Sequence, residues 1–415
     1  MKLLTKKLNF FTFFFIVFLF KSILVILWGY HYEQDTPRYL LNIRHLYNPP
    51  LYPIVLRLLT KIYVNLYSVI LLQTLIFSIL VSLFSCFGKK NSIFYSLFWA
   101  FEPISAFFCS NLMSEWLFLA ILWASYMLWF SYNENSNFKN LTLFTCSAFL
   151  LYMTRYVGIT WFIYFIFYQF FFNKSNPRKH LILSILIFFI LTIPVRVVHY
   201  YTFQTFRVSA YDGLNLWNSV SVLYPKSSVQ KNPQNEFERF LLNFPDSIFS
   251  TENALLTHHM WNDSFPALAF ASKYHLNPVE INDIVQNTAI RLINENSWSS
   301  YFYYFVLPNF LNIFKLKEEK INIEPTYSYI ENFFGKHQLP DFVYRYEWIL
   351  MLLFIILIHL IYKPLDFLNG YILFYWIFIS FTSAIFMRYL YVVFPLGLLI
   401  FFEGILKINE RNEFK

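Results

Sequence analysis

Charged residues are scarce in this chain. Asp, Glu, Lys and Arg together make up 13% of the 415 residues, whereas soluble domains carry about 25%. Hydrophobic residues make up 57% and aromatic residues 23%. A composition so poor in charge excludes an ordinary soluble domain and predicts an integral membrane protein. The formal net charge of +8 is then ascribed to cytoplasmic Lys and Arg, and we expect no nucleic-acid partner.

Cysteine, glycine and nucleotide-binding motifs are also sparse. The three cysteines lie in or beside apolar runs, without the spacing of a metal site or a disulfide framework. Only 8 glycines and no visible repeat argue against a transporter built from interrupted repeats. Neither G-x-x-x-x-G-K-[ST] nor G-x-G-x-x-G occurs, so cytoplasmic ATP or dinucleotide chemistry is not expected. The pair His258-His259 followed by Asp263 lacks ligand spacing, and no metal ligand is assigned.

Long apolar runs make up much of the sequence. Runs that approach the length needed to cross about 30 Å of hydrocarbon occur at 10–28, 64–87, 92–109, 115–132, 141–155, 159–172, 181–201, 348–362, 371–386 and 389–405. They predict an all-α integral membrane protein with about ten transmembrane helices. The first run exceeds a signal-peptide core and no cleavage site follows it, which predicts a retained helix.

Loop charge predicts the orientation of these spans. Basic residues gather at 88–90, 173–180, 363 and 407–415, so these segments and both termini are predicted to be cytoplasmic. The loops 30–63 and 202–346 then face outward. Abundant Phe, Ile, Asn and Lys are typical of an AT-rich genome, and we expect a bacterial inner (plasma) membrane.

Three regions follow from this topology. Residues 1–201 form an N-terminal transmembrane module with the first outer loop at 30–63, and residues 347–415 form the C-terminal spans and a cytoplasmic tail. Residues 202–346 are too long for a plain connector and predict an outer-face, mostly helical segment. Within it, Asn277, Pro278 and Glu280 form a capping signal ahead of apolar residues at helical spacing, which predicts an amphipathic helix over 277–294.

The segment 301–316 is apolar and aromatic but contains Pro308. It is either an interfacial helix or another span.

The first outer loop is the polar segment most suited to chemistry. Asp35 is either an ionised carboxylate in interfacial water or the cap of a short helix, and both roles are compatible. Arg38 follows at a spacing that allows it to pair with Asp35. Three prolines within 48–53 exclude a continuous helix and predict a sharp turn. A second amphipathic helix bearing Arg57 and Lys61 should follow.

Several short motifs occur in order along the chain. They comprise Asp35, Arg38 and Tyr39; Pro49, Pro50 and Pro53; Glu102-Pro103 ahead of Ser114-Glu115-Trp116-Leu117-Phe118; Thr154-Arg155-Tyr156-Val157-Gly158; and Met387-Arg388-Tyr389-Leu390 with Pro395. This ordered set resembles the polytopic GT-C glycosyltransferases, above all the protein-mannosyltransferase-like and aminoarabinose-transferase-like families. Thr36 stands where many relatives have a second acid, and Asn48 stands where aminoarabinose-type members tend to have Lys.

The resemblance implies an inverting hexosyl- or pentosyltransferase. Such an enzyme takes a sugar from a polyprenyl-phosphate donor in the bilayer and attaches it to an acceptor glycan, lipid or protein at the outer face. The reaction needs a base near the acceptor hydroxyl and cations around the leaving phosphate. We predict Asp35 as the base, with the donor phosphate bound by Arg155, Arg388 and Arg38. For Arg155 and Arg388 we favour this role over interfacial anchoring, because charge within the membrane is costly.

Further residues are candidates for the substrate cavity. They are Glu33, Tyr39, His45, Tyr52, Glu102, Glu115 and Tyr389. Glu115 begins a span and either caps it or pairs with a basic neighbour. Glu102 lies in an apolar run and needs a proton or a partner, and Lys21 either reaches the surface or pairs with it. No cofactor is required, although a divalent cation is compatible with the chemistry. The alternatives are a transporter or flippase of lipid-linked glycans, and a polymerase or ligase for surface polysaccharide.

Overall fold

Helices make up the secondary structure of the described chain. The computed structural model describes residues 2–29, 39, 49–62, 65–87, 92–172, 178–209, 216–217, 220, 229, 232–243, 276–307, 367–382, 393, 395–400 and 402–403, and no strand occurs within these ranges. The bundle helices are α1 (Lys2–Trp28), α4 (Leu66–Phe87), α5 (Ser92–Phe101), α6 (Pro103–Ser110), α7 (Glu115–Glu134), α8 (Phe138–Thr154), α9 (Ile159–Phe171), α10 (Arg178–Phe203) and α21 (Phe367–Thr382).

The bundle is arranged around α7. This helix buries residues on nearly all of its faces and packs against α4 and α8, while α1 packs against α4 and α5. The largest buried side chains include four tryptophans, Trp99, Trp116, Trp123 and Trp161. Trp123 meets Trp99 edge to face with ring centroids 5.4 Å apart. Aromatic packing of this kind stabilises a core beyond the burial of apolar area.

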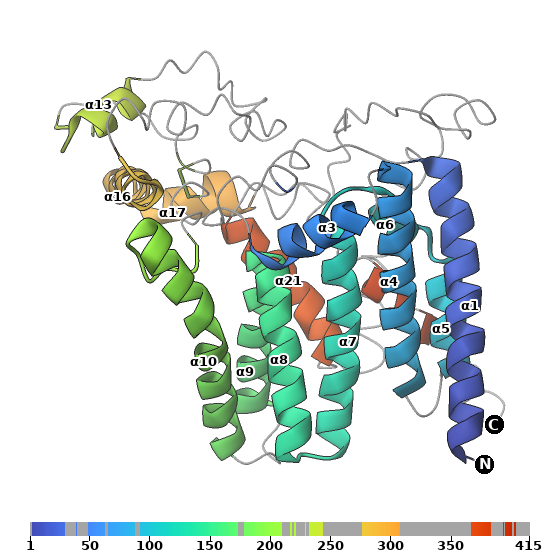
Figure 1. Cartoon of the computed structure of the whole chain (residues 1–415). Coiled ribbons are helices and arrows are strands. Elements are labelled where there is room, and N and C mark those ends of the chain that lie inside the picture. Colours follow the sequence, from blue (N-terminus) through green and yellow to red (C-terminus); the bar gives the residue numbers. More distant parts are fainter. Residues whose placement is uncertain are drawn as a thin grey trace.

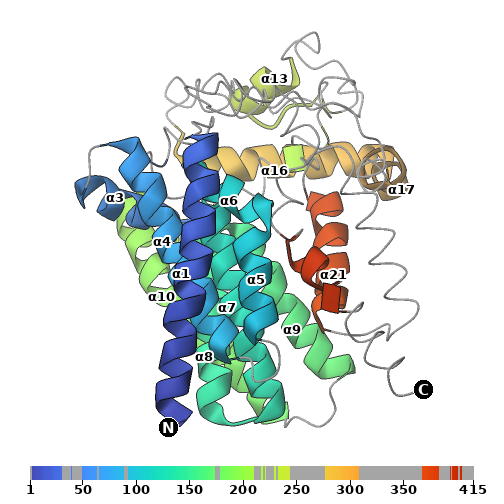
Figure 2. The ribbon, with the colours of Figure 1, turned by 90° about the vertical axis from the view of Figure 1, so that its right-hand side faces the viewer.

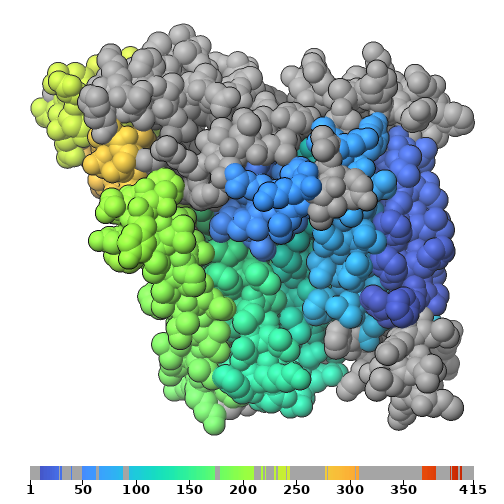
Figure 3. All heavy atoms as spheres, viewed as in Figure 1, coloured from blue at the N-terminus to red at the C-terminus, as the bar shows by residue number. Residues whose placement is uncertain are grey.

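The peripheral helices have the exposure expected of lipid-facing segments. In α1 the buried residues Phe13, Val17, Lys21 and Val25 recur every four residues, so one stripe faces the bundle. The helix stops where Gly29 takes a positive φ of 77° and donates its N–H to the Val25 carbonyl. Helix α10 exposes apolar side chains along most of its length (Figure 3).

Among the described residues, three helices are long and apolar enough to cross a membrane. They are the segments at 10–27, 66–86 and 178–203, and the pair α5 and α6, bent by 55°, adds a fourth if it forms one broken span. The chain is therefore best described as an all-helical membrane protein. The predicted runs at 115–132, 141–155, 159–172 and 371–386 also coincide largely with helices, but a total of ten spans stays a prediction. The run at 348–362 lies outside the described residues, as does most of 389–405.

The loop predicted to be the first outer one contributes α3 (Leu51–Ile62), the predicted amphipathic helix with Arg57 and Lys61. Tyr52, Leu56 and Leu59 are buried, whereas Arg57 and Lys61 are exposed. One detail of the prediction was wrong: the helix begins at Leu51, so Pro53 belongs to it rather than to the turn. Proline is tolerated there because the N–H groups of a first helical turn have no acceptor within the helix.

The region 202–346 has a hydrophobic core of its own. Its described helices are α13 (Glu236–Leu242), α16 (Pro278–Asn296), α17 (Trp298–Tyr301) and the π-helical turn η4 (Phe302–Val306). The predicted capping box of α16 is confirmed, with Asn277 and Glu280 each bonding the other's backbone N–H. Buried apolar residues of α16 pack with those of α13 and η4. Within 301–316, residues up to Leu307 are described, so its role as a span stays open.

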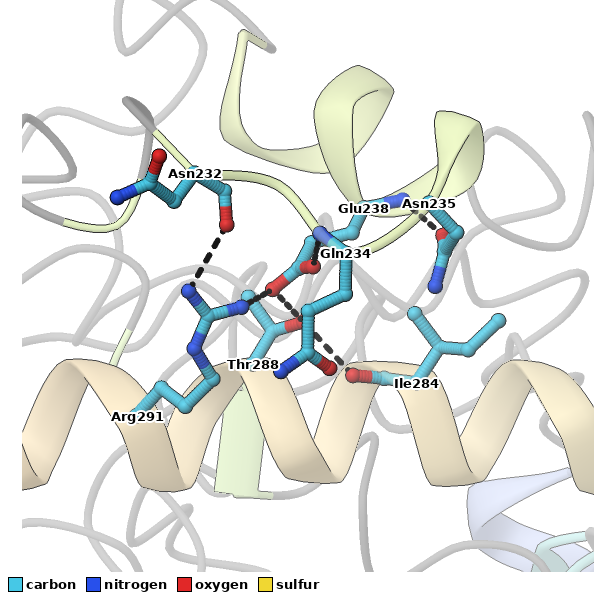
Figure 4. Close-up of polar contacts among 7 residues, drawn as sticks. All are labelled: Asn232, Gln234, Asn235, Glu238, Ile284, Thr288 and Arg291. Atoms are coloured by element: carbon cyan, nitrogen blue, oxygen red, sulfur yellow. Dashed lines mark hydrogen bonds and ion pairs between the residues drawn. The ribbon is translucent and has the colours of Figure 1, made fainter.

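A buried carboxylate joins α13 to α16 (Figure 4). Glu238 accepts hydrogen bonds from Arg291 at 2.6 Å, from the Thr288 hydroxyl at 3.1 Å and from the Gln234 backbone N–H at 2.5 Å. Arg291 also donates to the Asn232 carbonyl at 3.0 Å. The charge of Glu238 is thus both paired and hydrogen-bonded, as a buried carboxylate requires.

Helices α3, α13 and α16 lie at one end of the bundle, opposite the N-terminus (Figures 1 and 2). In these views α16 runs across the ends of the bundle helices. A functional site is therefore expected at the end of the bundle that carries α3 and α16.

Candidate functional site

An ion pair between Glu115 and Arg155 marks the candidate site. Glu115 is the first residue of α7, and Arg155 follows the last residue of α8. Nη1 of Arg155 contacts Oε1 of Glu115, and the two side chains are 11% and 3% exposed. An anchoring arginine extends into water or head groups, whereas this guanidinium is largely enclosed. The prediction that Glu115 pairs with a basic neighbour is consistent with this contact.

The backbone around Arg155 explains the position of its side chain. Helix α8 ends at Thr154 because Arg155 is extended, with φ −147° and ψ 131°. A short 3₁₀ turn, η1 (Tyr156–Gly158), follows, and the Gly158 N–H donates to the Arg155 carbonyl at 2.8 Å. A Cβ on Gly158 would lie 2.5 Å from the carbonyl carbon and oxygen of Leu151. Only glycine at position 158 therefore allows η1 to pack against the end of α8. This packing holds Arg155 beside α7.

Gln73 connects α3 and α4 to the turn between α6 and α7. Its side-chain oxygen accepts from the Tyr52 hydroxyl at 3.0 Å. Its side-chain nitrogen donates to the carbonyls of Cys109 at 3.0 Å and Asn111 at 3.1 Å. All of these groups are buried, so the loss of any one of these hydrogen bonds would leave an unsatisfied polar group away from water and would lower stability. The network holds the turn at residues 111–114 in place.

Aromatic contacts bring Tyr39 and Tyr52, which come from the segment between α1 and α4, to the same location. Tyr39 packs edge-on against Tyr52 with ring centroids 4.9 Å apart, and Tyr52 lies 6.3 Å from Trp116. Burial, followed by the charges of Tyr39 and Glu115, raises the pKa of Tyr52 well above its usual value. The Tyr52 phenol therefore stays protonated and acts as a hydrogen-bond donor.

Several buried oxygens at the start of α7 have no hydrogen-bond partner within the described chain. They are Oγ of Ser114 and Oδ1 of Asn111, and neither carboxylate oxygen of Glu115 is hydrogen-bonded in addition to its ion pair. Ser114 occupies the N-cap position of α7 but its side chain makes no capping bond. Such atoms in a folded protein call for an explanation, and a bound ligand or water is one.

A second buried ion pair lies where the α5–α6 span is broken. Nζ of Lys21 contacts the Glu102 carbonyl oxygen and lies 3.6 Å from its carboxylate, with both side chains at most 1% exposed. The Glu102 carboxylate also caps α6 by accepting from the N–H groups of Ile104 at 2.5 Å and Ser105 at 3.0 Å. Of the two alternatives for Lys21, the structure shows the pair with Glu102. The contacts of Glu102 join α1 to the start of α6, which is a structural role.

The structure brings together four of the candidate residues singled out in the sequence and places a fifth at a distance from them. Tyr39, Tyr52, Glu115 and Arg155 gather around the start of α7, and Glu102 lies at the other end of α6. The remaining candidates lie outside the described residues: Glu33, Asp35, Arg38, His45, Arg388 and Tyr389. The histidine pair at 258–259 does too.

Sequence reasoning missed Gln73 and Asn111, and it named Ser114 only as part of a motif. Gln73 was detectable, because an amide within an otherwise apolar span usually has a specific partner. Nothing in the sequence marked the side chains of Asn111 and Ser114 as binding groups, since short polar residues between helices are common.

The charges at the site limit what it can bind. Glu115 and Arg155 carry opposite charges, and no cluster of three or more His, Cys, Asp or Glu side chains suited to a metal occurs within the described ranges. A guanidinium has five N–H donors, enough to hold a carboxylate and a phosphate together. The site therefore combines one anion-binding group with several hydrogen-bond acceptors.

Comparisons with protein-family models, curated proteins and solved structures found no match for this chain. The resemblance to GT-C glycosyltransferases accordingly rests on the sequence motifs.

Proposed function

We propose that the protein is an inverting, GT-C type glycosyltransferase that moves a sugar from a polyprenyl-phosphate donor to an acceptor at the outer face of the membrane. The observation that carries the proposal is the meeting of separate sequence motifs at one end of the bundle. Tyr39 and Tyr52 of the first outer loop, the Ser114-Glu115-Trp116 motif and the Arg155 motif are joined there by contacts. A helix bundle with apolar spans supports a lipid-linked donor.

The proposed chemistry is a single displacement at the anomeric carbon. Asp35 takes the proton from the acceptor hydroxyl, and the acceptor oxygen forms a bond to the anomeric carbon. The bond from that carbon to the phosphate oxygen breaks, and polyprenyl phosphate leaves with the electron pair. Arg155, with Arg388 and Arg38, offsets the charge on the leaving phosphate. Glu115 fixes the guanidinium of Arg155, so that one group is oriented before the donor binds.

The proposal is tested by Asp35→Asn in membranes that supply the acceptor. A radiolabelled polyprenyl-phosphoryl hexose is the donor, and both label transfer and release of polyprenyl phosphate are measured. We expect transfer to fall at least about 100-fold, since a positioned base contributes on the order of 10²–10⁴. Donor binding should be unchanged. Asp283→Asn, in the exposed pair with Arg207, is the control. Normal turnover by Asp35→Asn would remove the proposed base.

A flippase of lipid-linked glycans is the second candidate. Transporters often carry substrate sites at broken spans, and the α5–α6 break with its buried Lys21–Glu102 pair is such a feature. The same labelled donor in sealed vesicles separates the two functions. Movement of intact donor across the bilayer without release of polyprenyl phosphate would favour the flippase.

A further inference from the structure

The turn between α6 and α7 contains polar atoms that the fold leaves unused. Asn111 is 4% exposed and Ser114 is 1% exposed, so water does not reach these side chains freely. Yet Oδ1 of Asn111 and Oγ of Ser114 have no hydrogen-bond partner in the part of the chain that the structure describes. An unsatisfied buried polar group costs about 1–3 kcal/mol. Two such groups in one turn lower the stability of the fold, so they need an explanation other than stability.

Other caps in this protein show what Ser114 fails to do. Asn137 caps α8 by accepting from the Asn140 N–H, and Asn277 caps α16 by accepting from the N–H groups of Val279 and Glu280. Ser114 stands at the same position of α7, but its backbone is helical, with φ −76° and ψ −9°, and its hydroxyl makes no such bond. The hydroxyl is therefore available for another group.

The turn is held in place from two sides. Gln73 bonds the carbonyls of Cys109 and Asn111, and Tyr52 in turn bonds Gln73. On the other side, Glu115 is paired with Arg155. A turn fixed in this way keeps its unused oxygens in one arrangement, and preorganisation of this kind favours binding.

Charge and donor–acceptor character define the ligand. Asn111 Oδ1 and the Glu115 carboxylate oxygens accept hydrogen bonds, and Ser114 both donates and accepts. Arg155 already neutralises Glu115, so among the described residues the turn has no net negative charge to attract a metal ion or an ammonium group. A neutral group rich in O–H donors fits best.

We propose that the turn of Asn111, Ser114 and Glu115 binds the hydroxyl groups of a neutral sugar. This inference rests on the proposed function, in which Arg155 binds the phosphate to which that sugar is attached. It adds the sugar class: a neutral hexose or pentose is bound in preference to an amino sugar. The sugar hydroxyls donate to Asn111 Oδ1 and Ser114 Oγ and so supply the partners that these oxygens lack.

Binding of three probes to the purified full-length protein tests the inference. They are farnesyl phosphate, its glucosyl ester and its 4-amino-4-deoxyarabinosyl ester. Wild-type protein should bind the glucosyl ester most tightly. Ser114→Ala and Asn111→Ala should each weaken glucosyl-ester binding about five- to tenfold, the change expected for one hydrogen bond, and leave farnesyl phosphate binding unchanged. Ser110→Ala is the matched control, because the equally buried Ser110 hydroxyl already donates to the Phe107 carbonyl at 2.7 Å.

The outcomes separate this inference from the proposed function. If wild-type protein binds none of the probes, the proposed function fails. If it binds all three equally and neither Ser114→Ala nor Asn111→Ala changes the glucosyl affinity, the sugar subsite is overturned while phosphate binding stands. Tighter binding of the amino-sugar ester would also overturn the preference for a neutral sugar.

Discussion

Gly158 decides where Arg155 lies. Only a residue without a Cβ fits against the Leu151 backbone, because the added carbon would lie 2.5 Å from backbone atoms that have little freedom to move. Tyr156 secures the same turn from outside by donating its hydroxyl to the Val208 carbonyl at 3.0 Å. The geometry of the ion pair with Glu115 thus depends on a residue that carries no chemistry.

Gly158→Ala should therefore lower both stability and donor binding. We expect about 1–3 kcal/mol of destabilisation, the usual cost of overpacking, together with weaker binding of farnesyl phosphate as η1 and Arg155 shift. Thermal unfolding in detergent and a binding titration measure the two effects. The control is Gly370→Ala, whose Cβ would meet the side chain of Tyr164 rather than backbone. If Gly370→Ala weakens phosphate binding as much as Gly158→Ala does, the local explanation is wrong.

The buried pair of Lys21 and Glu102 allows a prediction about charge. Lys21→Met leaves the Glu102 carboxylate buried without its cation, and loss of one partner in a buried pair costs about 3–5 kcal/mol. The double variant Lys21→Met with Glu102→Gln removes both charges and should recover part of that loss. Unfolding of the single and double variants completes the cycle. Additive effects would show that the two side chains do not interact.

At the scale of elements, α3 carries a second surface. Ile54, Arg57, Leu58 and Lys61 are all exposed, and their helical spacing places them on one face, which alternates apolar and basic residues. The helix lies across the end of the bundle in Figure 1. An amphipathic helix of this composition is suited to the plane of the head groups.

Arg57→Gln with Lys61→Gln should reduce the preference for anionic phospholipid. Each basic residue near a charged membrane surface contributes about 1 kcal/mol, so we expect roughly a 30-fold lower selectivity for phosphatidylglycerol over phosphatidylcholine. Native mass spectrometry with each lipid measures it. The control is Lys139→Gln with Lys179→Gln, two exposed lysines at the start of α8 and α10. Equal losses in both double variants would mean that total charge, rather than α3, sets the preference.

At the scale of the whole molecule, two hydrophobic cores are distinct. One fills the helix bundle and the other joins α13, α16 and η4. Arg207 of the segment after α10 pairs with Asp283 of α16, but both side chains are about 40% exposed. Exposed pairs contribute little, with a median of about 0–1 kcal/mol. A mutation in the second core should therefore destabilise that core and leave the stability of the bundle unchanged.

Glu238→Gln tests that independence. The substitution removes the negative charge to which Arg291 and Thr288 donate hydrogen bonds. We expect about 3 kcal/mol of local destabilisation. Hydrogen exchange should rise over 278–296 and stay unchanged over 115–134. Asp283→Asn, in the exposed pair, should leave both segments near wild type. Faster exchange in α7 of Glu238→Gln would show that the two cores unfold together.

Local signals in the sequence predicted much of the helical structure. The capping residues of α16, the amphipathic pattern of α3 and the apolar runs of α1, α4 and α10 act within a few turns of chain, so their structural effects are readable from the residues themselves. The start of α3 was missed because proline is compatible with both a turn and a first helical turn.

The site could be predicted only in part. Arg155 was recognised as a costly charge near a membrane span, and Glu115 as a residue that either caps a span or pairs with a basic neighbour, but that neighbour was not identified. Asn111 and Ser114 gained importance only when the fold buried them without partners. Such a property depends on what every neighbouring segment provides.

The sequence by itself determined that this is a helical membrane protein, because low charge and long apolar runs leave the backbone no other way to satisfy its hydrogen bonds in lipid. Only the tertiary structure decided which charges meet. Lys21 meets Glu102 across 81 positions, and Arg155 meets Glu115 where α7 begins and α8 ends. The physical reason is that a buried charge is stabilised by whichever opposite charge helix packing brings near, and packing depends on the whole chain.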